Sequence, residues 1–177
     1  EEIVSIIREA GIVGMGGATF PTAVKLNVPA GKKVDTLVLN GAECEPYLSA
    51  DHRLMLEHAE QIVSGARIIQ KVLGIERVMI GIEDNKPQAI EKLRQESAND
   101  PTIEVVPLKA MYPKGAEKVI AYETCGKVIK EGQLPFQAGV IISNVTSMAF
   151  IGEYLTTGMP LITKTLTVDG SAIKEPK

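Results

Sequence analysis

The chain has 177 residues, a formal net charge of −3, 45% hydrophobic residues and 23% charged residues, which is the size and balance of one globular domain. Mixed charges and few aromatic residues argue against a nucleic-acid partner, and no apolar run is long enough to cross a bilayer. The two cysteines, Cys44 and Cys125, lie far apart and outside any C-x-x-C pair, so the sequence predicts neither a zinc site nor a disulfide framework.

The first predicted element is a helix over residues 1–10, because Ile3, Ile6 and Ile7 recur at helical spacing and Gly11 is a typical C-terminal cap. A glycine-rich stretch, GIVGMGGATFPTAVKL, follows this helix. Glycine lets main-chain N–H groups approach a ligand closely and adopt positive φ angles. We therefore interpret the stretch as a ligand-binding loop, with a plain connector as the alternative.

Short strands and longer helices alternate along the rest of the chain. Strands are predicted over 34–40, 77–83, 102–108 and 139–144, where valine and isoleucine form nearly continuous apolar runs. Helices are predicted between and after them, at about 53–73, 87–97, 115–125 and 145–157. This alternation predicts an α/β fold, with a mostly parallel sheet and helices on both faces.

We expect residues 1–160 to form one domain. The run LITKTLTVDG alternates like an exposed or antiparallel strand, so residues 161–177 are expected to begin a following unit. A chain that starts with Glu1 and Glu2 and stops at KEPK is expected to be a piece of a longer protein.

Two familiar glycine fingerprints do not fit the loop. A P-loop would place its lysine directly after a glycine, whereas Lys25 comes well after Gly17. A G-x-G-x-x-G motif starting at Gly14 would need glycine at Thr19, and it should follow a strand instead of a helix. The loop is therefore not a standard nucleotide motif.

Polar residues follow the ends of three predicted strands: Asn40, Glu43 and Glu45; Tyr112, Lys114, Gly115 and Glu117; and Asn144. In open α/β sheets ligands bind beyond the carboxyl ends of the strands, and a helix N-terminus such as the one after Asn144 favours a phosphate. Each segment alone is also explained by helix capping. Their joint placement favours a ligand site.

Other kinds of site are less well supported. Glu43 and Glu45 could form a glycosidase-like carboxylate pair, but residues two apart on a loop need not converge. His52 and His58 lack the i, i+4 spacing of a helical metal site. No G-x-S-x-G motif supports nucleophilic hydrolysis.

The motifs together resemble a known family. GMGGATFPTAVKL, NGAECEPYLSADHRLM, YPKGAEKVI and ISNVTS resemble the flavin-binding and NADH-binding segments of the flavoprotein subunits of respiratory complex I. GAECEPYLSADHRLMLEH and KTLTVDGSAIKEP resemble the C subunits of Rnf electron-transport complexes, which are ion-translocating ferredoxin:NAD oxidoreductases. The resemblance covers essentially the whole chain. It implies a Rossmann-like FMN/NADH-binding domain, followed from residue 161 by the start of a β-rich, ubiquitin-like, soluble-ligand-binding unit.

The resemblance implies noncovalent FMN that exchanges hydride with NAD(H), with no catalytic residue supplied by the protein. The implied FMN-binding residues are Gly14, Gly16, Gly17, Lys25, Asn40, Glu43, Tyr112, Gly115 and Asn144. The implied NADH-binding residues are Phe20, Glu45 and Glu117. The chain departs from the complex I pattern at Met15, Thr19, Val28, Ala42, Ala116, Ser143 and Thr146. Because Val28 replaces an aromatic residue that helps to hold adenine, the flavin site is better supported than tight NADH binding.

The resemblance also implies partners. Two four-iron four-sulfur clusters are expected in the full-length protein outside this chain, which has no run of ligating cysteines. Other subunits of the electron-transport complex are expected as partners, with ferredoxin as an indirect one, at the cytoplasmic face of the membrane without insertion. A cobalamin reductase of a bacterial microcompartment and a scaffold domain without flavin are the alternatives.

Overall fold

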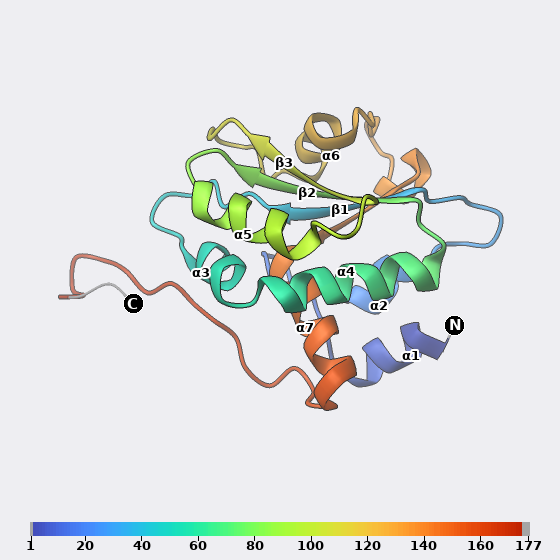
Figure 1. The fold of residues 1–177 in the computed structure, drawn as a ribbon, viewed down its shortest axis with the longest axis horizontal. Coiled ribbons are helices and arrows are strands. Elements are labelled where there is room, and N and C mark those ends of the chain that lie inside the picture. Colours follow the sequence, from blue (N-terminus) through green and yellow to red (C-terminus); the bar gives the residue numbers. More distant parts are fainter. Residues whose placement is uncertain (1, 175–177) are drawn as a thin grey trace.

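A parallel sheet with helices on both faces organises the computed structural model, which describes residues 2–174 (Figure 1). The elements in chain order are α1 Glu2–Glu9, α2 Thr22–Leu26, β1 Thr36–Gly41, α3 Ala50–Glu57, α4 Ala59–Leu73, β2 Arg77–Glu83, α5 Pro87–Ser97, β3 Ile103–Leu108, α6 Glu117–Cys125, the 3-10 helix η1 Pro135–Ala138, β4 Val140–Asn144 and α7 Val145–Thr157. The predicted α/β fold is confirmed.

The sheet has four parallel strands in the order β3-β2-β1-β4. Alternate residues of β1 face opposite layers, because side chains along a strand point to opposite faces. Leu37 and Leu39 join the larger core, to which α3, α4, α5 and α7 contribute, whereas Val38 packs with Ile120 of α6 on the other face. Since β1 lies between β2 and β4, the ends of β1 and β4 are neighbours.

The four predicted strands agree with the observed ones to within two residues. The helix predicted over about 53–73 is instead two helices, which begin earlier and are separated at His58 with φ −128° and ψ 32°. His58 ends α3 and caps α4 through its backbone, and the apolar spacing continues across the break, so periodicity does not reveal it. Helix α2 was not predicted, because five residues are too few for a periodic pattern.

Helices α4 and α7 pack closely through two glycines. A Cβ atom on Gly65 would lie 2.0 Å from the carbonyl oxygen of Met148, and one on Gly152 would lie 2.4 Å from the carbonyl oxygen of Gln61. These distances are far below van der Waals contact, so the two helix backbones can approach only where side chains are absent.

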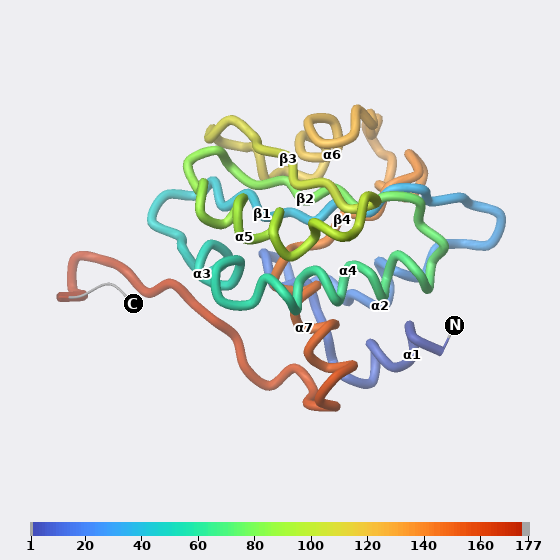
Figure 2. The backbone as a smooth tube through the Cα atoms, viewed as in Figure 1, coloured from blue at the N-terminus to red at the C-terminus, as the bar shows by residue number. Residues whose placement is uncertain are grey.

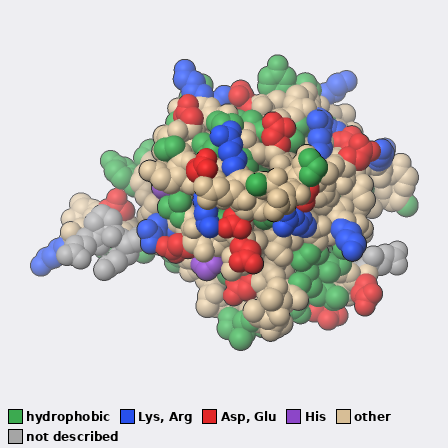
Figure 3. Space-filling view, in the orientation of Figure 1, with side chains coloured by type: hydrophobic (Ala, Val, Ile, Leu, Met, Phe, Trp, Pro, Cys, Tyr) green, Lys and Arg blue, Asp and Glu red, His purple; other side chains and the backbone are tan. Residues whose placement is uncertain are grey.

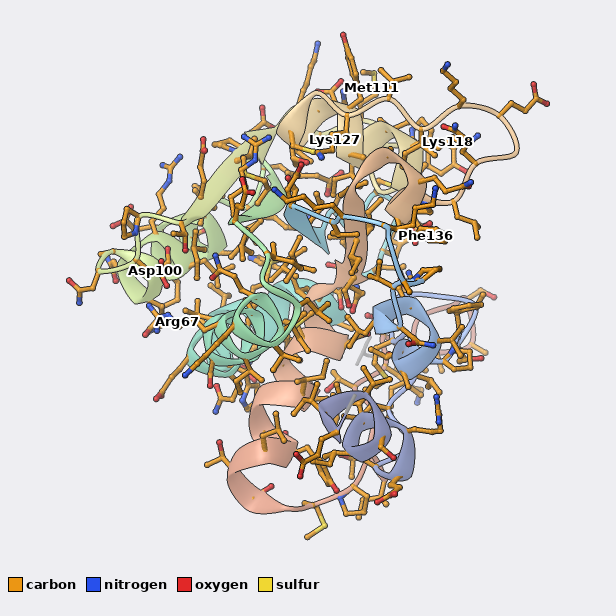
Figure 4. The ribbon with its side chains drawn as sticks, turned by 90° about the vertical axis from the view of Figure 1, so that its right-hand side faces the viewer. Arg67, Asp100, Met111, Lys118, Lys127 and Phe136 are labelled. Carbon is orange, nitrogen blue, oxygen red and sulfur yellow. The ribbon has the colours of Figure 1, made fainter. Side chains whose placement is uncertain are left out.

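Ion pairs bind the elements together at the amino ends of the strands, the end that faces the viewer in Figure 4. Arg67 of α4 points toward Asp100, and Nε lies 3.0 Å from Oδ2. Lys127 Nζ lies 2.6 Å from Asp35 Oδ1. Acidic and basic side chains are interspersed on the face that carries α4 and α5 (Figure 3). The exposed pairs contribute little free energy each.

Residues 159–174 form neither a helix nor a strand. The alternating run at 161–170 therefore has no strand partner at the sheet edges β3 and β4, and the expected domain boundary at residue 160 stays a prediction. Within residues 2–174, the helices are all too short or too polar to span a membrane.

Candidate functional site

A cavity of about 710 Å³ lies beyond the carboxyl ends of β1 and β4. This is the position at which open α/β sheets bind ligands, and the volume is that of a typical cofactor site. The cavity lining includes all twelve residues predicted from the sequence, namely Gly14, Gly16, Gly17, Phe20, Lys25, Asn40, Glu43, Glu45, Tyr112, Gly115, Glu117 and Asn144. The structure thus brings the predicted residues together, while their individual roles toward a ligand stay predictions.

The glycine-rich loop is closed at its base. The N–H of Gly14 donates to the carbonyl oxygen of Phe20 at 2.8 Å, so residues 14–20 form one wall of the cavity. A Cβ atom on Gly16 would lie 2.7 Å from Asn144 Nδ2, whereas one on Gly17 would meet nothing within 4 Å. Within residues 14–20 the residue with a positive φ angle is Thr19, and the clustered glycines have none. Gly16 is therefore required for packing against Asn144, and Gly17 leaves room in the cavity.

Lys25 and Glu117 form an ion pair from two elements that are far apart in the sequence. Lys25 Nζ of α2 lies 2.8 Å from Glu117 Oε1 of α6, and both side chains are partly exposed. An exposed pair of this kind contributes at most about 1 kcal/mol. Each group can therefore exchange its partner for a ligand at little cost.

Asn40 joins the end of β1 to the loop before α6. Its Nδ2 donates to the carbonyl oxygen of Gly115 at 2.8 Å, and its Oδ1 accepts from the N–H of Ala42 at 3.1 Å. A Cβ atom on Gly115 would lie 3.1 Å from the carbonyl oxygen of Ala42. Asn40 and Gly115 therefore shape the floor of the cavity.

Glu43 caps α3 from a distance. Its two carboxylate oxygens accept from the N–H groups of Asp51 and His52 at 3.0 and 3.3 Å, whereas the side chain of Ser49, at the N-cap position, makes no capping bond. Burial raises the pKa of Glu43, and the backbone bonds oppose that rise. Glu43 thus fixes the loop that carries Glu45.

Glu45 differs from the other acidic residues of the cavity. Glu43, Asp51 and Glu117 all accept hydrogen bonds within the protein, but Glu45 is exposed and has no hydrogen-bond or ion-pair partner among residues 2–174. Its carboxylate is free to accept from a ligand hydroxyl.

Asp51 is a cavity residue that the sequence reasoning missed. Its Oδ2 accepts from Asn144 Nδ2 and its Oδ1 from Thr146 Oγ1, both at 2.7 Å. Asn144 Oδ1 in turn accepts from the N–H of Thr146 at 2.9 Å and caps α7. A carboxylate thus already lies at the helix N-terminus where a phosphate was expected. Asp51 stands within the motif YLSADHRLM, which was the available signal.

His52 lies beside a second hollow of about 460 Å³ that shares Glu43, Glu45 and Tyr112 with the main cavity. Its Nε2 is buried and has no hydrogen-bond partner among residues 2–174. The hollow also contains the buried ion pair of Lys86 Nζ with Glu83 Oε2, 2.5 Å apart. Burial, followed by the positive charges of Lys86 and Arg53, holds the pKa of His52 below its ordinary value of 6.5.

This depressed pKa predicts a pH-dependent stability. Because the unfolded chain binds the proton of His52 more readily, the stabilisation is present above about pH 6.5 and is lost as the pH falls through the folded-state pKa. His52→Gln is expected to lose less unfolding free energy than the parent between about pH 7.5 and about pH 5.5 in urea titrations. Equal pH dependence in the parent and His52→Gln would contradict the assignment.

The seven positions that depart from the complex I pattern fall into two groups, inside and outside the cavity lining. Val28 packs against the larger core and is not among the cavity-lining residues. Met15, Thr19, Ala42, Ala116, Ser143 and Thr146 all line the cavity. Among the described residues, no cluster of three histidine, cysteine or acidic side chains could hold a metal ion.

Comparison with known proteins agrees with the motifs. The family model described as the Nuo51 FMN-binding domain matches residues 7–153. The chain is 49% identical, over its full length, to the C subunit of the proton-translocating ferredoxin:NAD(+) oxidoreductase complex of Clostridium ljungdahlii. It is 50% identical to the Na(+)-translocating counterpart of Acetobacterium woodii. It spans only 38% and 40% of the lengths of these two relatives. The resemblance to Rnf C subunits is confirmed.

A solved structure shares the fold. The crystal structure of the NAD+-reducing NiFe hydrogenase in the air-oxidized state superposes with a TM-score of 0.74 at 20% sequence identity. The match covers 88% of this chain and 30% of the hydrogenase chain. At this identity the match supports the α/β architecture alone.

Proposed function

This chain belongs to the Nuo51 FMN-binding domain family, and from this we propose that its cavity holds a noncovalent FMN. We propose further that the domain is the site at which an electron-transport complex exchanges hydride with NAD(H). The observation that carries it is the convergence, on one cavity of about 710 Å³, of twelve predicted residues from four motifs that are separate in the sequence.

The residues present fit a flavin nucleotide. The volume suits a cofactor of that size, and Gly17 leaves open space in the wall. Lys25 supplies an ammonium group that an exposed ion pair holds only weakly. Asn40, Gly115 and Tyr112 line the same cavity. The resemblance implies that Asn40 contacts the ribityl chain or the ring edge of the flavin and that Tyr112 and Gly115 shape the pocket.

Bound FMN would supply the redox chemistry by taking up or releasing a hydride, and the protein would supply position and exclusion of water. Lys25 would neutralise phosphate charge, with Asn144 beside the phosphate. Gly16 and Glu43 would act indirectly, because Gly16 packs on Asn144 and Glu43 holds the start of α3. No side chain needs to transfer a proton in this scheme.

NADH would bind on the open side of the cavity. Phe20 is half exposed there and offers an aromatic face. Glu45 would accept from a ribose hydroxyl, because its carboxylate has no partner among the described residues. Glu117 would also contact NADH once its ion pair with Lys25 is broken.

The wider setting is carried over from the relatives as part of the proposal. Their names describe subunits of ferredoxin:NAD(+) oxidoreductase complexes that translocate protons or sodium ions. Electrons would leave the flavin for four-iron four-sulfur clusters outside this chain and then pass to or from ferredoxin through other subunits. The domain would sit at the cytoplasmic face of the membrane, and residues 161–177 would begin the following β-rich unit.

The proposal predicts that Glu45→Gln slows reduction of the flavin by NADH and leaves FMN binding unchanged. The amide keeps the size of the side chain but loses strong acceptance, and hydrogen bonds to charged groups contribute about 1.5 to 3 kcal/mol. We expect a loss of about one to two orders of magnitude in the rate at limiting NADH, measured by anaerobic stopped-flow bleaching of the FMN absorbance.

The matched control is Glu131→Gln, at an exposed glutamate that does not line the cavity. NADH should reduce the FMN bound to this variant at the parental rate. A Glu45→Gln protein reduced as fast as the parent would show that Glu45 does not contact the nucleotide. Loss of FMN instead would place Glu45 with the flavin. A parent protein that takes up no FMN would favour the scaffold alternative.

A further inference from the structure

The segment after α7 crosses the mouth of the cavity. Residues 159–170, here called the strap, leave the end of α7 and run toward the carboxyl ends of the strands past α3 (Figures 1 and 2). Two hydrogen bonds fasten it: the N–H of Leu161 donates to the carbonyl oxygen of Ala10 at 3.1 Å, and the N–H of Ser49 donates to Thr167 Oγ1 at 3.0 Å. Lys164, Thr165, Leu166 and Thr167 line the cavity between and at these points.

The cavity lining carries more negative than positive charges. Four carboxylates line it, those of Glu43, Glu45, Asp51 and Glu117, against the two ammonium groups of Lys25 and Lys164. Lys25 is already paired with Glu117. Lys164 is exposed and forms no hydrogen bond or ion pair with any residue from 2 to 174.

A phosphate group would meet this excess of carboxylates. A phosphomonoester carries between one and two negative charges at neutral pH, and Asp51 already lies at the N-terminus of α7. Placing a further anion there is unfavourable unless a cation accompanies it. The cation on the cavity lining that has no partner within the described residues is Lys164.

We propose that the strap is part of the nucleotide site and that Lys164 binds a phosphate group of the nucleotide in the cavity. This inference rests on the proposed function, since it assigns a further ligand to the same cavity. The hydroxyl of Thr167 accepts from Ser49 and keeps its own hydrogen for donation. A lysine with neighbouring hydroxyl donors is a suitable set for a phosphate oxyanion. The phosphate is that of FMN or the pyrophosphate of NAD(H).

The test compares Lys164→Gln with Lys174→Gln, which removes the same charge from a described lysine that does not line the cavity. FMN and riboflavin are titrated into each apoprotein, and NAD+ into each FMN-loaded protein. We expect Lys164→Gln to weaken either FMN or NAD+ about tenfold at low salt, with a smaller effect at high salt because of screening. Lys164→Arg should restore most of the affinity, and riboflavin binding should be unchanged.

The outcomes separate the two phosphate sources and the two proposals. Weaker FMN with unchanged riboflavin assigns Lys164 to the phosphomonoester, and weaker NAD+ with unchanged FMN assigns it to the pyrophosphate. Unchanged affinity for both nucleotides, an equal loss for riboflavin, or the same loss in Lys174→Gln would each overturn the inference. The parent titration tests the proposed function alone, because it does not depend on Lys164.

A second readout uses the strap itself. Trypsin cleaves after lysine, so the bond after Lys164 reports whether the strap is covered. The nucleotide that depends on Lys164 should slow cleavage at this bond in the parent protein and leave cleavage after Lys174 unaffected. Equal protection of both bonds, or of neither, would contradict a specific contact.

Discussion

Replacing Gly65 with alanine is expected to destabilise the fold strongly, although alanine is the better helix former. Its Cβ would lie 2.0 Å from the carbonyl oxygen of Met148 on α7, so α4 and α7 would have to move apart. Overpacking of a core typically costs about 1 to 3 kcal/mol and occasionally more, whereas the gain in helix propensity is about 1 kcal/mol. Because the Cβ would meet backbone atoms, which cannot turn aside as a flexible side chain can, we take the upper end of this range and expect a net loss of about 2 kcal/mol in the free energy of unfolding.

Urea denaturation followed by circular dichroism measures this loss. Ser64→Ala is the control, because Ser64 is the neighbouring residue on α4, is only half-buried and makes no side-chain hydrogen bond with the described residues. It should stay within about 0.5 kcal/mol of the parent. A Gly65→Ala protein as stable as the parent would show that α4 and α7 are not in backbone contact at this position.

Replacing Lys25 and Asn144 together with alanine is expected to weaken FMN binding by about two orders of magnitude. A charged hydrogen bond contributes about 1.5 to 3 kcal/mol and a neutral one about 0.5 to 1.5 kcal/mol, and about 1.4 kcal/mol corresponds to a factor of ten. The loss should be confined to FMN, so that riboflavin binds the variant and the parent equally. Fluorescence titration with both flavins measures the difference.

The double substitution should also lower the stability of the fold. Asn144 caps α7 and donates to Asp51, so its loss should also cost about 1 kcal/mol of stability. A double variant at Lys32 and Asn99, both exposed and outside the cavity, controls for the change in charge. Unchanged FMN affinity in the Lys25 and Asn144 variant would show that neither residue contacts the phosphate of FMN.

The strands and most helices could be predicted because their apolar patterns are local. Strands β1, β2 and β4 are nearly continuous apolar runs buried on both faces. Helix α7 has Asn144 as its N-cap and Gly158 at its C-terminal end, and α5 begins at Pro87. The break at His58 and the short α2 carry no such signal. The close contact at Gly65 and Gly152 depends on two helices that meet only in the folded chain.

The location of the site was predictable for a topological reason. The carboxyl ends of parallel strands share one edge of the sheet, so residues that follow β1 and β4 must converge there. Their hydrogen bonds were not predictable, since they join residues far apart in the sequence: 95 positions in the bond from Thr146 to Asp51, and 132 in the bond from the N–H of Met15 to Ser147 Oγ. The same limit explains why the close approach of Gly16 to Asn144 could not be predicted, whereas the role of Gly16 toward a ligand stays a prediction.

Calorimetric titration of the parent protein with FMN and riboflavin shows whether the cavity at the ends of β1 and β4 holds FMN. We expect saturable binding of a single FMN per chain, with riboflavin bound distinctly more weakly because it lacks the phosphate. Absence of saturable FMN binding would contradict the proposed FMN site, and equal affinity for the two flavins would contradict the phosphate subsite.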